Sequence, residues 1–370
     1  MIDIILAIAT ISSIVYFIIL FALLSGILKS SSKISNYTYK VSIVVSARNE
    51  SKNIGNLLDD LLKQKYDKDL IEIIVVNDRS EDDTGDILNR YANIHRIIKI
   101  VTINKTYSSL SPKKYAISKA IEIAKGDIIL STDADCRLNK LWLHSMVSYF
   151  SPEVGAVAGG VILHPTKWIF SYLMTIDAIM NNLIIDGSLG WNFPMACKGG
   201  NFAYRRCVYY EVGGFTGLEK SLSGDDDLLL QKISRMSNWK IRNCMNRGAL
   251  VESFAPSNAA HFLSQRKRHI SASKYFSKNI QFIYSMYFFS KLFMFISFLW
   301  ILFNIGINNP ISYFILFLYS LTLIMLLDVS KNNMQKKYLL FYPLWELYYL
   351  LNHIILAPFA LLGKVKWGER

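Results

Sequence analysis

Short apolar strands alternate with helical segments between residues 41 and 133, and this alternation constrains the fold more than any other feature. The strand patterns are VSIVVSA (41–47), IEIIVVND (71–78), IIKIVTI (97–103) and DIILSTD (127–133). Helical patterns fill the intervals at 53–65, 82–91 and 113–125. Short strands that are apolar throughout and separated by helices are typical of a parallel sheet with helices on both faces. We therefore predict an α/β fold with a mainly parallel sheet.

Polar side chains follow three of these strands. Arg48 and Glu50 come after the first strand, Asp78 ends the second, and Asp133 and Asp135 come at the end of the fourth. Right-handed crossovers place the carboxyl ends of parallel strands at one edge, where open α/β sheets bind ligands. Carboxylates at such an edge bind hard cations, and a divalent cation there neutralises a diphosphate. No G-x-G-x-x-G or P-loop motif is present, so carboxylates and a metal are expected to hold the nucleotide.

Apolar segments at both ends of the chain predict membrane helices. Residues 4–28 are almost wholly apolar, which is long enough to cross a bilayer core of about 30 Å. No Lys or Arg precedes this stretch and no small-residue cleavage site follows it, which favours a retained anchor. Lys29, Lys33 and Lys40 follow immediately, and the positive-inside rule then places the downstream chain in the cytoplasm.

The second apolar block has three segments, near 286–307, 311–328 and 338–362. The Asn-Asn-Pro turn at 308–310 fits the outer face, and the basic loop 331–337 fits the inner face. Three crossings would leave the tail GKVKWGER outside, against the same rule. Pro343 and Pro358 could instead break the last segment into a re-entrant hairpin that returns the tail to the cytoplasm. Both arrangements stay open at this point.

The net charge of +13 does not predict nucleic-acid binding, because the basic residues are dispersed and many flank apolar segments. Anionic lipid headgroups are the more economical partner. The four cysteines, at 136, 197, 207 and 244, lack metal-ligand spacing and are expected to be reduced cytoplasmic thiols.

Five ordered motifs over residues 41–272 carry a family resemblance. They are VSIVVSARNE (41–50), EIIVVNDRSEDDT (72–84), the segment ending in DIILSTDADC (127–136), KGGNFAYRR (198–206) and SLSGDDDLLL (221–230). A sixth, SQRKRHISAS (264–273), stands where membrane-bound members carry Q-x-x-R-W. In this order the motifs resemble those of a membrane-bound family 2 glycosyltransferase. The resemblance implies a GT-A fold, which is a Rossmann-like mixed sheet with helices on both faces, with transmembrane helices at both ends.

The resemblance implies a donor site for a UDP- or GDP-linked sugar. Asp78 would accept a hydrogen bond from a base N–H, although Ser80 and Asp82 could also make this turn a helix cap. Asp133 and Asp135 would hold Mg²⁺ or Mn²⁺, with Asp133 shared with the ribose. Lys113 or Lys114 could approach the diphosphate. The expected nucleotide-sugar-binding residues are Ala47, Arg48, Glu50, Asp78, Lys114, Asp133 and Gln265.

The resemblance also implies an acceptor site with a general base. Asp226 is expected to take the proton of the acceptor hydroxyl, with Asp225 at the position of the family's Glu. These acids would suit a helix N-terminus equally well. Gly199, Gly200 and Asn201 are expected to border the acceptor.

The last motif offers Gln265, Arg266 and Arg268, with His269 where the family carries Trp. Arg268 is expected to assist departure of the diphosphate by bidentate hydrogen bonding. A lipid-binding basic patch is the alternative for this segment. The missing Trp removes an aromatic platform for an acceptor sugar, which argues against a processive polymer synthase.

Three domains are therefore expected: an anchor (1–28), a cytoplasmic glycosyltransferase domain (38–275) and a membrane domain of about three transmembrane or re-entrant segments (283–363). The expected activity is inverting, metal-dependent hexosyl transfer from a nucleotide-diphosphate sugar to a lipid-linked or glycan acceptor at the inner membrane. Such an enzyme would build a cell envelope glycan. The alternatives are a processive polysaccharide synthase, or a noncatalytic membrane subunit that binds nucleotide sugars.

Overall fold

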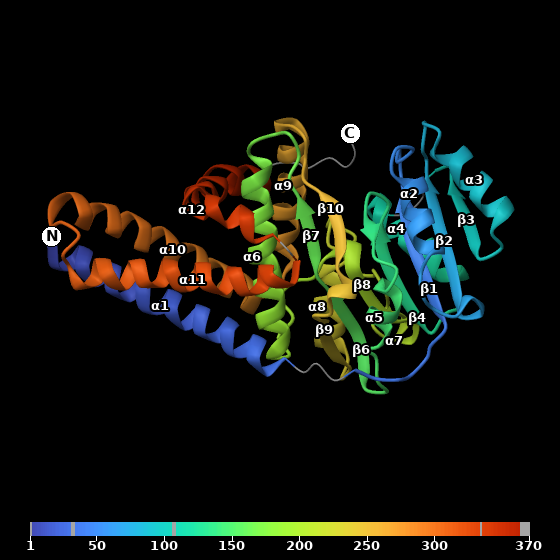
Figure 1. The fold of residues 1–370 in the computed structure, drawn as a ribbon, viewed down its shortest axis with the longest axis horizontal. Helices are drawn as coiled ribbons and strands as arrows, with labels where there is room; N and C mark the ends of the chain where they lie inside the picture. Colours follow the sequence, from blue (N-terminus) through green and yellow to red (C-terminus); the bar gives the residue numbers. More distant parts are fainter. Residues whose placement is uncertain (1, 31–33, 106–108, 334, 363–370) are drawn as a thin grey trace.

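The computed structural model describes residues 2–30, 34–105, 109–333 and 335–362. An α/β part that contains two sheets adjoins an elongated bundle of apolar helices (Figure 1). The strands are β1 (Val41–Ala47), β2 (Ile71–Asp78), β3 (Ile98–Ile103), β4 (Ile128–Asp133), β5 (Arg137–Leu138), β6 (Val154–Gly159), β7 (Val161–His164), β8 (Phe202–Arg205), β9 (Lys240–Cys244) and β10 (Val251–Phe254).

The α-helices fall into two groups. Those of the α/β part are α2 (Ile54–Leu62), α3 (Thr84–Ile94), α4 (Pro112–Ile123), α5 (Trp142–Val147), α6 (Ser171–Gly190), α7 (Arg206–Glu211), α8 (Asp227–Met236) and α9 (Ala259–Ala272). The apolar helices are α1 (Ile2–Lys29), α10 (Lys278–Asn304), α11 (Pro310–Asn333), α12 (Tyr342–Leu351) and α13 (Ala357–Leu362). Short turns of other helix types are η1 (Lys68–Leu70), η2 (Gly199–Asn201), η3 (Arg247–Ala249), η4 (Ser273–Tyr275), η5 (Lys336–Phe341) and η6 (Asn352–Leu356).

The main sheet has seven strands in the order β3-β2-β1-β4-β8-β6-β9, and β8 runs antiparallel to both of its neighbours. Its other neighbouring strands pair in parallel, so the predicted mixed, mainly parallel sheet is confirmed. Alternate residues of β1 enter different cores, because successive side chains of a strand point to opposite faces. Ile43 and Val45 pack with α2 and α5 on one face, and Val44 packs with α4 and α8 on the other. A second sheet has the order β5-β10-β7.

Four helical segments are long and apolar enough to cross a membrane, and they match the predicted apolar segments. Three of them, α1, α10 and α11, run side by side away from the sheets (Figure 1). The fourth comprises η5, α12, η6 and α13 and lies at the end of the bundle nearest the sheets (Figure 1). The tail after residue 362, whose side of the membrane the sequence left open, lies outside the described residues.

An ion pair lies inside the apolar bundle. Lys291 of α10 and Glu346 of α12 approach to 2.6 Å, and their side chains are only 1% and 7% exposed. Four aromatic rings surround the ammonium group at 4.6 to 5.5 Å from the ring centroids, those of Tyr16, Tyr287, Trp345 and Tyr349. The pair and its rings therefore join α1, α10 and α12 at one point.

Helix α1 packs directly on α6 of the α/β part through glycines. A Cβ atom added at Gly26 would lie 2.0 Å from the carbonyl oxygen of Gly187, and one added at Gly190 would lie 1.8 Å from that of Gly26. The indole of Trp191 donates a hydrogen bond to the carbonyl of Ala22 at 2.9 Å. No larger residue fits at these glycines without separating the two helices.

Candidate active site

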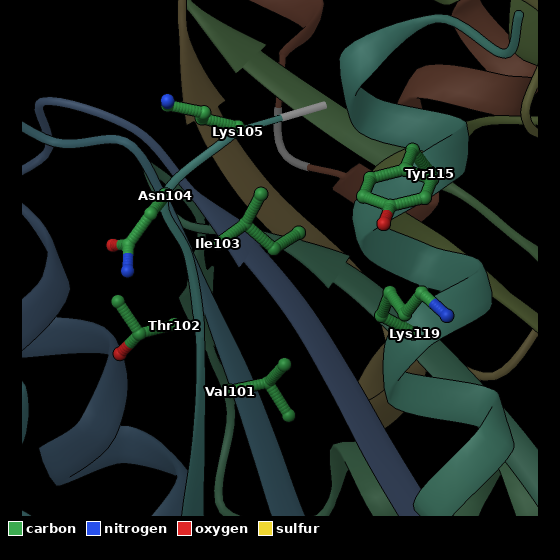
Figure 2. Close-up of a pocket in the computed structure, with 7 residues that line it drawn as sticks. All are labelled: Val101, Thr102, Ile103, Asn104, Lys105, Tyr115 and Lys119. Atoms are coloured by element: carbon green, nitrogen blue, oxygen red, sulfur yellow. The ribbon is translucent and has the colours of Figure 1, made fainter. Parts of the chain in front are cut away.

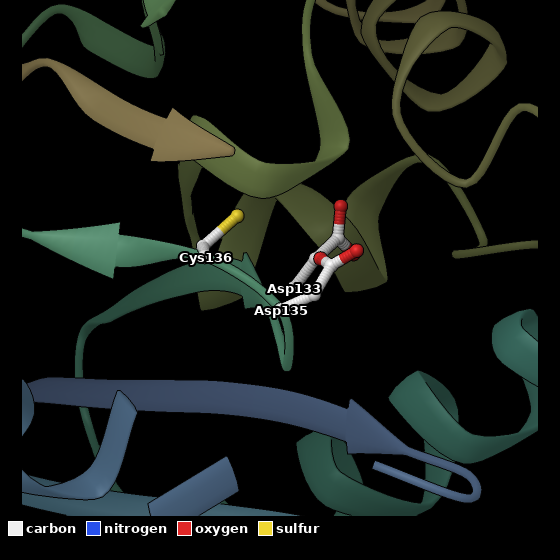
Figure 3. Close-up of side chains that lie close together, drawn as sticks. All are labelled: Asp133, Asp135 and Cys136. Atoms are coloured by element: carbon white, nitrogen blue, oxygen red, sulfur yellow. The ribbon is translucent and has the colours of Figure 1, made fainter. Parts of the chain in front are cut away.

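The two aspartates of the D-x-D motif lie where β4 ends and the chain turns. Asp133 is the last residue of β4, and the backbone N–H of Cys136 donates to its carbonyl at 3.1 Å to close the turn. One ligand atom from each of Asp133, Asp135 and Cys136 lies within 4.8 Å of the others. Both carboxylates point to the same side of the turn, and the sulfur lies apart from them (Figure 3).

This donor set suits a hard divalent cation. Two partly exposed carboxylates supply oxygen ligands, and their exposure leaves room for phosphate oxygens and water. Burial, followed by the charges of Asp133 and Asp135, raises the pKa of the Cys136 thiol well above its usual value. A protonated thiol is a poor ligand, so the oxygen atoms favour Mg²⁺ or Mn²⁺ over a thiolate-binding metal.

A second acidic cluster opens helix α8. The Asp226 carboxylate accepts a hydrogen bond from the backbone N–H of Asp227 at 2.7 Å, so this residue caps the helix. The Asp227 carboxylate accepts from the backbone N–H of Cys197, also at 2.7 Å. Asp225 forms an ion pair with Lys113 instead, so the neighbouring acids Asp225 and Asp226 have different partners.

Lys113 joins the two acidic clusters. Its ammonium group lies 2.8 Å from Asp133 Oδ1 and 2.8 Å from Asp225 Oδ2. These contacts bring the end of β4 and the start of α8, which are about 90 residues apart in sequence, to either side of one side chain. The neighbouring carboxylates outweigh the effect of burial and raise the pKa of Lys113, so it stays charged.

Lys114, which the sequence favoured for the diphosphate, points elsewhere. Its side chain is fully buried, and its ammonium group donates to the carbonyls of Leu218 and Ser221 at 3.0 and 2.6 Å. Burial lowers the pKa of Lys114 to about 8. The choice between the two lysines therefore falls on Lys113, because only its amine lies against the acids.

Two glycines allow the clusters to approach. A Cβ atom at Gly199 would lie 3.0 Å from Asp226 Oδ2 and 3.2 Å from the Lys113 ammonium group, and one at Gly200 would lie 3.3 Å from Asp133 Oδ2. Both glycines thus lie beside the acids, and their role at the border of an acceptor stays a prediction. Asn201 differs from the expectation that it borders an acceptor. Its side chain is fully buried and bonds to Trp142 and to the carbonyls of Gly160 and Ala249.

The environment of Asp226 suits a general base. Burial, followed by the charge of Asp225, raises the pKa of Asp226 to about 6, and Lys113 opposes this shift. A carboxylate with a pKa slightly below neutral pH is ionised and still accepts a proton readily. Helix capping and proton acceptance are compatible here, because the cap uses only one carboxylate oxygen, Oδ1.

The turns after β1 and β2 are tied to each other. The N–H of Asn49 donates to Ser80, the N–H of Glu81 donates to the Asn49 side chain, and the N–H of Glu50 donates to Thr84 at 2.8 Å. Asn49 has φ of 55°, in the left-handed region where asparagine is tolerated better than most residues. Ala47 ends β1 and is buried, whereas the following Arg48 is half-buried. The register of β1 with β2 and β4 aligns these turns with Asp133.

Asp78 ends β2 and is paired with its neighbour. Both carboxylate oxygens accept from the guanidinium of Arg79, at 2.8 and 3.1 Å, and the side chain is almost fully buried. An open pocket of about 430 Å³ lies next to it, between the end of β3 and α4 (Figure 2). Tyr115 and Lys119 of α4 face Ile103 and Val101 of β3 across this pocket (Figure 2). The acidic clusters do not line it.

Comparison with known proteins decides the family. The family model described as Glycosyl transferase family group 2 matches residues 128–329, which is more than half of the chain, and the model Glycosyl transferase family 2 matches residues 42–213. The chain belongs to the family 2 glycosyltransferases. Over 196 residues the transferase is 32% identical to the probable glycosyltransferase YdaM of Bacillus subtilis, a match that covers 52% of the chain and 46% of that protein.

A second curated relative and a solved structure are also similar to the transferase. It is 27% identical over 215 residues to a beta-monoglucosyldiacylglycerol synthase of Synechocystis, which covers 56% of the chain and 42% of that protein. The matched part thus spans less than half of the length of YdaM and less than half of that of the Synechocystis synthase. Among solved structures, a mannosyltransferase of Pyrobaculum calidifontis in complex with GDP-Man and Mn²⁺ aligns with a TM-score of 0.60 at 18% identity. That alignment covers 95% of the chain and 98% of the mannosyltransferase, and it confirms the GT-A fold.

The last predicted motif of the transferase lies on α9. Arg266 forms an ion pair with Asp177 of α6 and also donates to the Tyr348 hydroxyl of α12 at 3.4 Å. Gln265 and Arg268 lie on the same helix with half-buried side chains. Arg266 therefore serves contacts between helices.

Two charged residues of the transferase were not selected from the sequence. Burial lowers the pKa of Lys198, while the charges of Asp227 and Asp177 oppose the shift. Lys198 opens the KGGNFAYRR motif, and its place beside two glycines was the available signal. Asp177 lies in an otherwise apolar helical stretch, where a lone acid marks a buried ion pair.

Proposed function

We propose that this transferase moves a sugar from a nucleotide-diphosphate donor to an acceptor hydroxyl, with inversion at the anomeric carbon and with a divalent cation. The observation that carries the proposal is the position of Lys113 between Asp133 and Asp225, at 2.8 Å from each. This contact brings the metal-binding end of β4 next to the acids of α8. A diphosphate held at one cluster would have its sugar directed at the other.

The donor would be held by the turns after β1, β2 and β4. Asp133 and Asp135 would hold Mg²⁺ or Mn²⁺, which neutralises the leaving diphosphate when bound. The complex of the Pyrobaculum mannosyltransferase with GDP-Man and Mn²⁺ supports a divalent cation together with a nucleotide-sugar donor. Lys113 would contact the same phosphates, and Asp78 would receive a base N–H after Arg79 moves aside. Ala47, Arg48 and Glu50 would line the nucleoside, and Gln265 and Arg268 would meet the diphosphate from α9.

The chemical step would use Asp226 as the base. The acceptor oxygen forms a bond to the anomeric carbon while the bond from that carbon to the diphosphate oxygen breaks, and the acceptor proton passes to Asp226. Burial and the charge of Asp225 raise the pKa of this carboxylate to about 6, although Lys113 opposes the shift, and this value suits a general base. Gly199 and Gly200 would keep space for the acceptor beside the base.

We further propose that residues 1–28 and 283–363 hold the protein in the inner membrane, with the transferase domain (38–275) in the cytoplasm. The four apolar helical segments and the lysines after α1 support this placement. A membrane-delivered, lipid-linked acceptor is part of this proposal, and the name of the Synechocystis relative, a beta-monoglucosyldiacylglycerol synthase, supports a lipid acceptor.

The test is a panel of UDP- and GDP-sugars, scored in purified membranes for diphosphate release with Mg²⁺ or Mn²⁺. One donor is expected to be consumed, chelation is expected to stop the reaction, and Asp226→Asn is expected to lower turnover by about 10² to 10⁴. Asp69→Asn, at an exposed acid just before the start of β2 and so at the opposite end of this strand from the site, is the matched control and should keep full activity. Metal-dependent turnover that persists in Asp226→Asn would show that this residue is not the base.

A further inference from the structure

The fourth apolar segment, from η5 to α13, exposes a stripe of large apolar side chains along one face. Its members are exposed by 45% to 83%, and they follow one another at intervals of three or four residues: Leu340, Leu344, Leu347, Leu351, Ile355 and Phe359. That spacing places them on one side of a helix. A stripe of this length left to water would be costly, so an apolar partner is required.

The opposite face of the segment is already occupied by protein. Trp345, Glu346 and Tyr349 are buried, and Glu346 pairs with Lys291 of α10. The Tyr348 hydroxyl accepts a hydrogen bond from Arg266 of α9. Helix α12 packs on α6, and α13 packs on α9. This face of the segment therefore packs on α6, α9 and α10, whereas the apolar stripe is exposed.

Its position differs from that of the three long helices. Helices α1, α10 and α11 reach together to the far end of the bundle, whereas α12 stays at the end nearest the sheets (Figure 1). The segment is also the least apolar of the four, and it changes helix type at η5 and η6. A crossing helix would be expected to extend beside the other three, which this segment does not do.

Charge gives an independent reason. Lys336 and Lys337 begin the segment and are exposed, and the sequence after it contains Lys364, Lys366 and Arg370. If the segment crossed a membrane, these two basic groups would lie on opposite sides. If it lies along one surface, both groups lie on the side of the transferase domain, as the positive-inside rule requires.

We infer that only α1, α10 and α11 span the bilayer, and that the segment from η5 to α13 lies in the plane of the inner leaflet. Its apolar stripe enters the boundary between headgroups and acyl chains, where helices with one apolar face bind. The partner of this surface is therefore lipid, with anionic headgroups facing Lys336 and Lys337. The inference rests on the proposed membrane placement and adds the number of spans and the role of the fourth segment.

The first test measures sidedness in cells. In a Cys207→Ser background, which removes the exposed thiol, single cysteines replace Asn308, Lys337 or Leu361, and a membrane-impermeant maleimide is applied before and after the membrane is opened. Three spans predict that Asn308→Cys lies on one side, with Lys337→Cys and Leu361→Cys together on the other. Labelling of Leu361→Cys from the same side as Asn308→Cys would overturn the inference.

The second test measures depth with bimane on single cysteines, quenched by lipids brominated at a shallow or a deep acyl position. Leu344→Cys, Leu351→Cys and Phe359→Cys should all be quenched at least twofold more by the shallow bromine. Ile324→Cys, an exposed position on α11, should be quenched more by the deep one. Deep quenching at Leu351→Cys with shallow quenching at both flanking positions would indicate a crossing helix. Absence of deep quenching at Ile324→Cys would instead count against the membrane placement itself.

Discussion

Two lysines of this protein pair with carboxylates in opposite settings. Lys113 lies between Asp133 and Asp225 at the edge of the sheet, and the Asp133 side chain is 37% exposed. Lys291 pairs with Glu346 inside the helical bundle, where both side chains are almost completely buried and aromatic rings surround the amine. A ligand can reach the first set of charges and exchange partners with it. The second set is closed, so its charges can only hold helices together.

The largest expected effect comes from breaking the closed pair. Glu346→Ala leaves the Lys291 ammonium group buried without its partner, and we expect a loss of about 3–5 kcal/mol in the free energy of unfolding. The double variant Lys291→Met with Glu346→Met removes both charges and should be within about 1 kcal/mol of the parent or more stable. Thermal unfolding in detergent measures both. Equal destabilisation of the single and double variants would show that the ion pair is not closed as described.

The next largest effect is expected from the ion pairs of Lys113 with Asp133 and Asp225. Lys113→Met keeps the length of the side chain but removes the charge that links Asp133 to Asp225, and we expect turnover to fall by about 100-fold, as for loss of one electrostatic contact to a leaving group. The midpoint of thermal unfolding should change less than in Glu346→Ala, because the side chains of Lys113 and Asp133 are partly exposed, at 21% and 37%. Lys119→Met, on the same helix with an exposed ion pair, serves as the control. Unfolding of the protein by Lys113→Met but not by Lys119→Met would show that Lys113 stabilises the fold, as Lys291 does.

The pH dependence of activity is a further test of the acids at the sheet edge. Asp226 accepts a proton only when ionised, and its pKa is raised to about 6 by burial and by Asp225. We therefore expect kcat/KM to be constant above about pH 7 and to fall about tenfold per unit below pH 6. Initial rates between pH 5 and 8 measure this. Asp225→Asn removes a neighbouring negative charge and should move the midpoint to lower pH, and an unchanged midpoint would argue against Asp226 as the titrating group.

The smallest expected effect concerns a buried acid that has an amide partner instead of a lysine. Burial raises the pKa of Asp186 to about 7, against the hydrogen bond from Asn243. The folded state then holds this proton more tightly than the unfolded chain, so stability falls as pH rises from about 4 to 7. Asp186→Asn should remove that loss and raise stability at pH 8 by on the order of 1 kcal/mol, with a smaller gain at pH 5. A gain that is independent of pH would contradict this account.

Much of the fold was predictable because it depends on periodic patterns. The apolar strands at 41–47, 71–78 and 128–133 and the three long helices were found from composition and spacing, since burial on both faces leaves few other solutions. The convergence of the strand ends at one edge followed from right-handed crossovers. The sequence could not distinguish a crossing helix from one that lies on the domain, because both need a similar number of apolar residues.

The orientation of the side chains in the site could not be predicted from the sequence. Lys113 and Lys114 are adjacent, and only their position on α4 decides that one reaches the acids while the other is held by loop carbonyls. Asn201 belongs to a glycine-rich motif, yet its amide serves three buried bonds that depend on distant residues. Arg266 and Arg268 differ by two positions, which on a helix is enough to point them in different directions.

The glycine contact between α1 and α6 has a consequence for how the enzyme meets its substrates. Because Gly26 touches Gly187 and Gly190 backbone to backbone, any separation or sliding of α1 along α6 would break this close contact. If α1 spans the bilayer as proposed, this contact would fix the height of the α/β part above the lipid surface. An acceptor would then have to bring its hydroxyl to the proposed base, Asp226, at that height, so the length of its headgroup would decide whether it reacts.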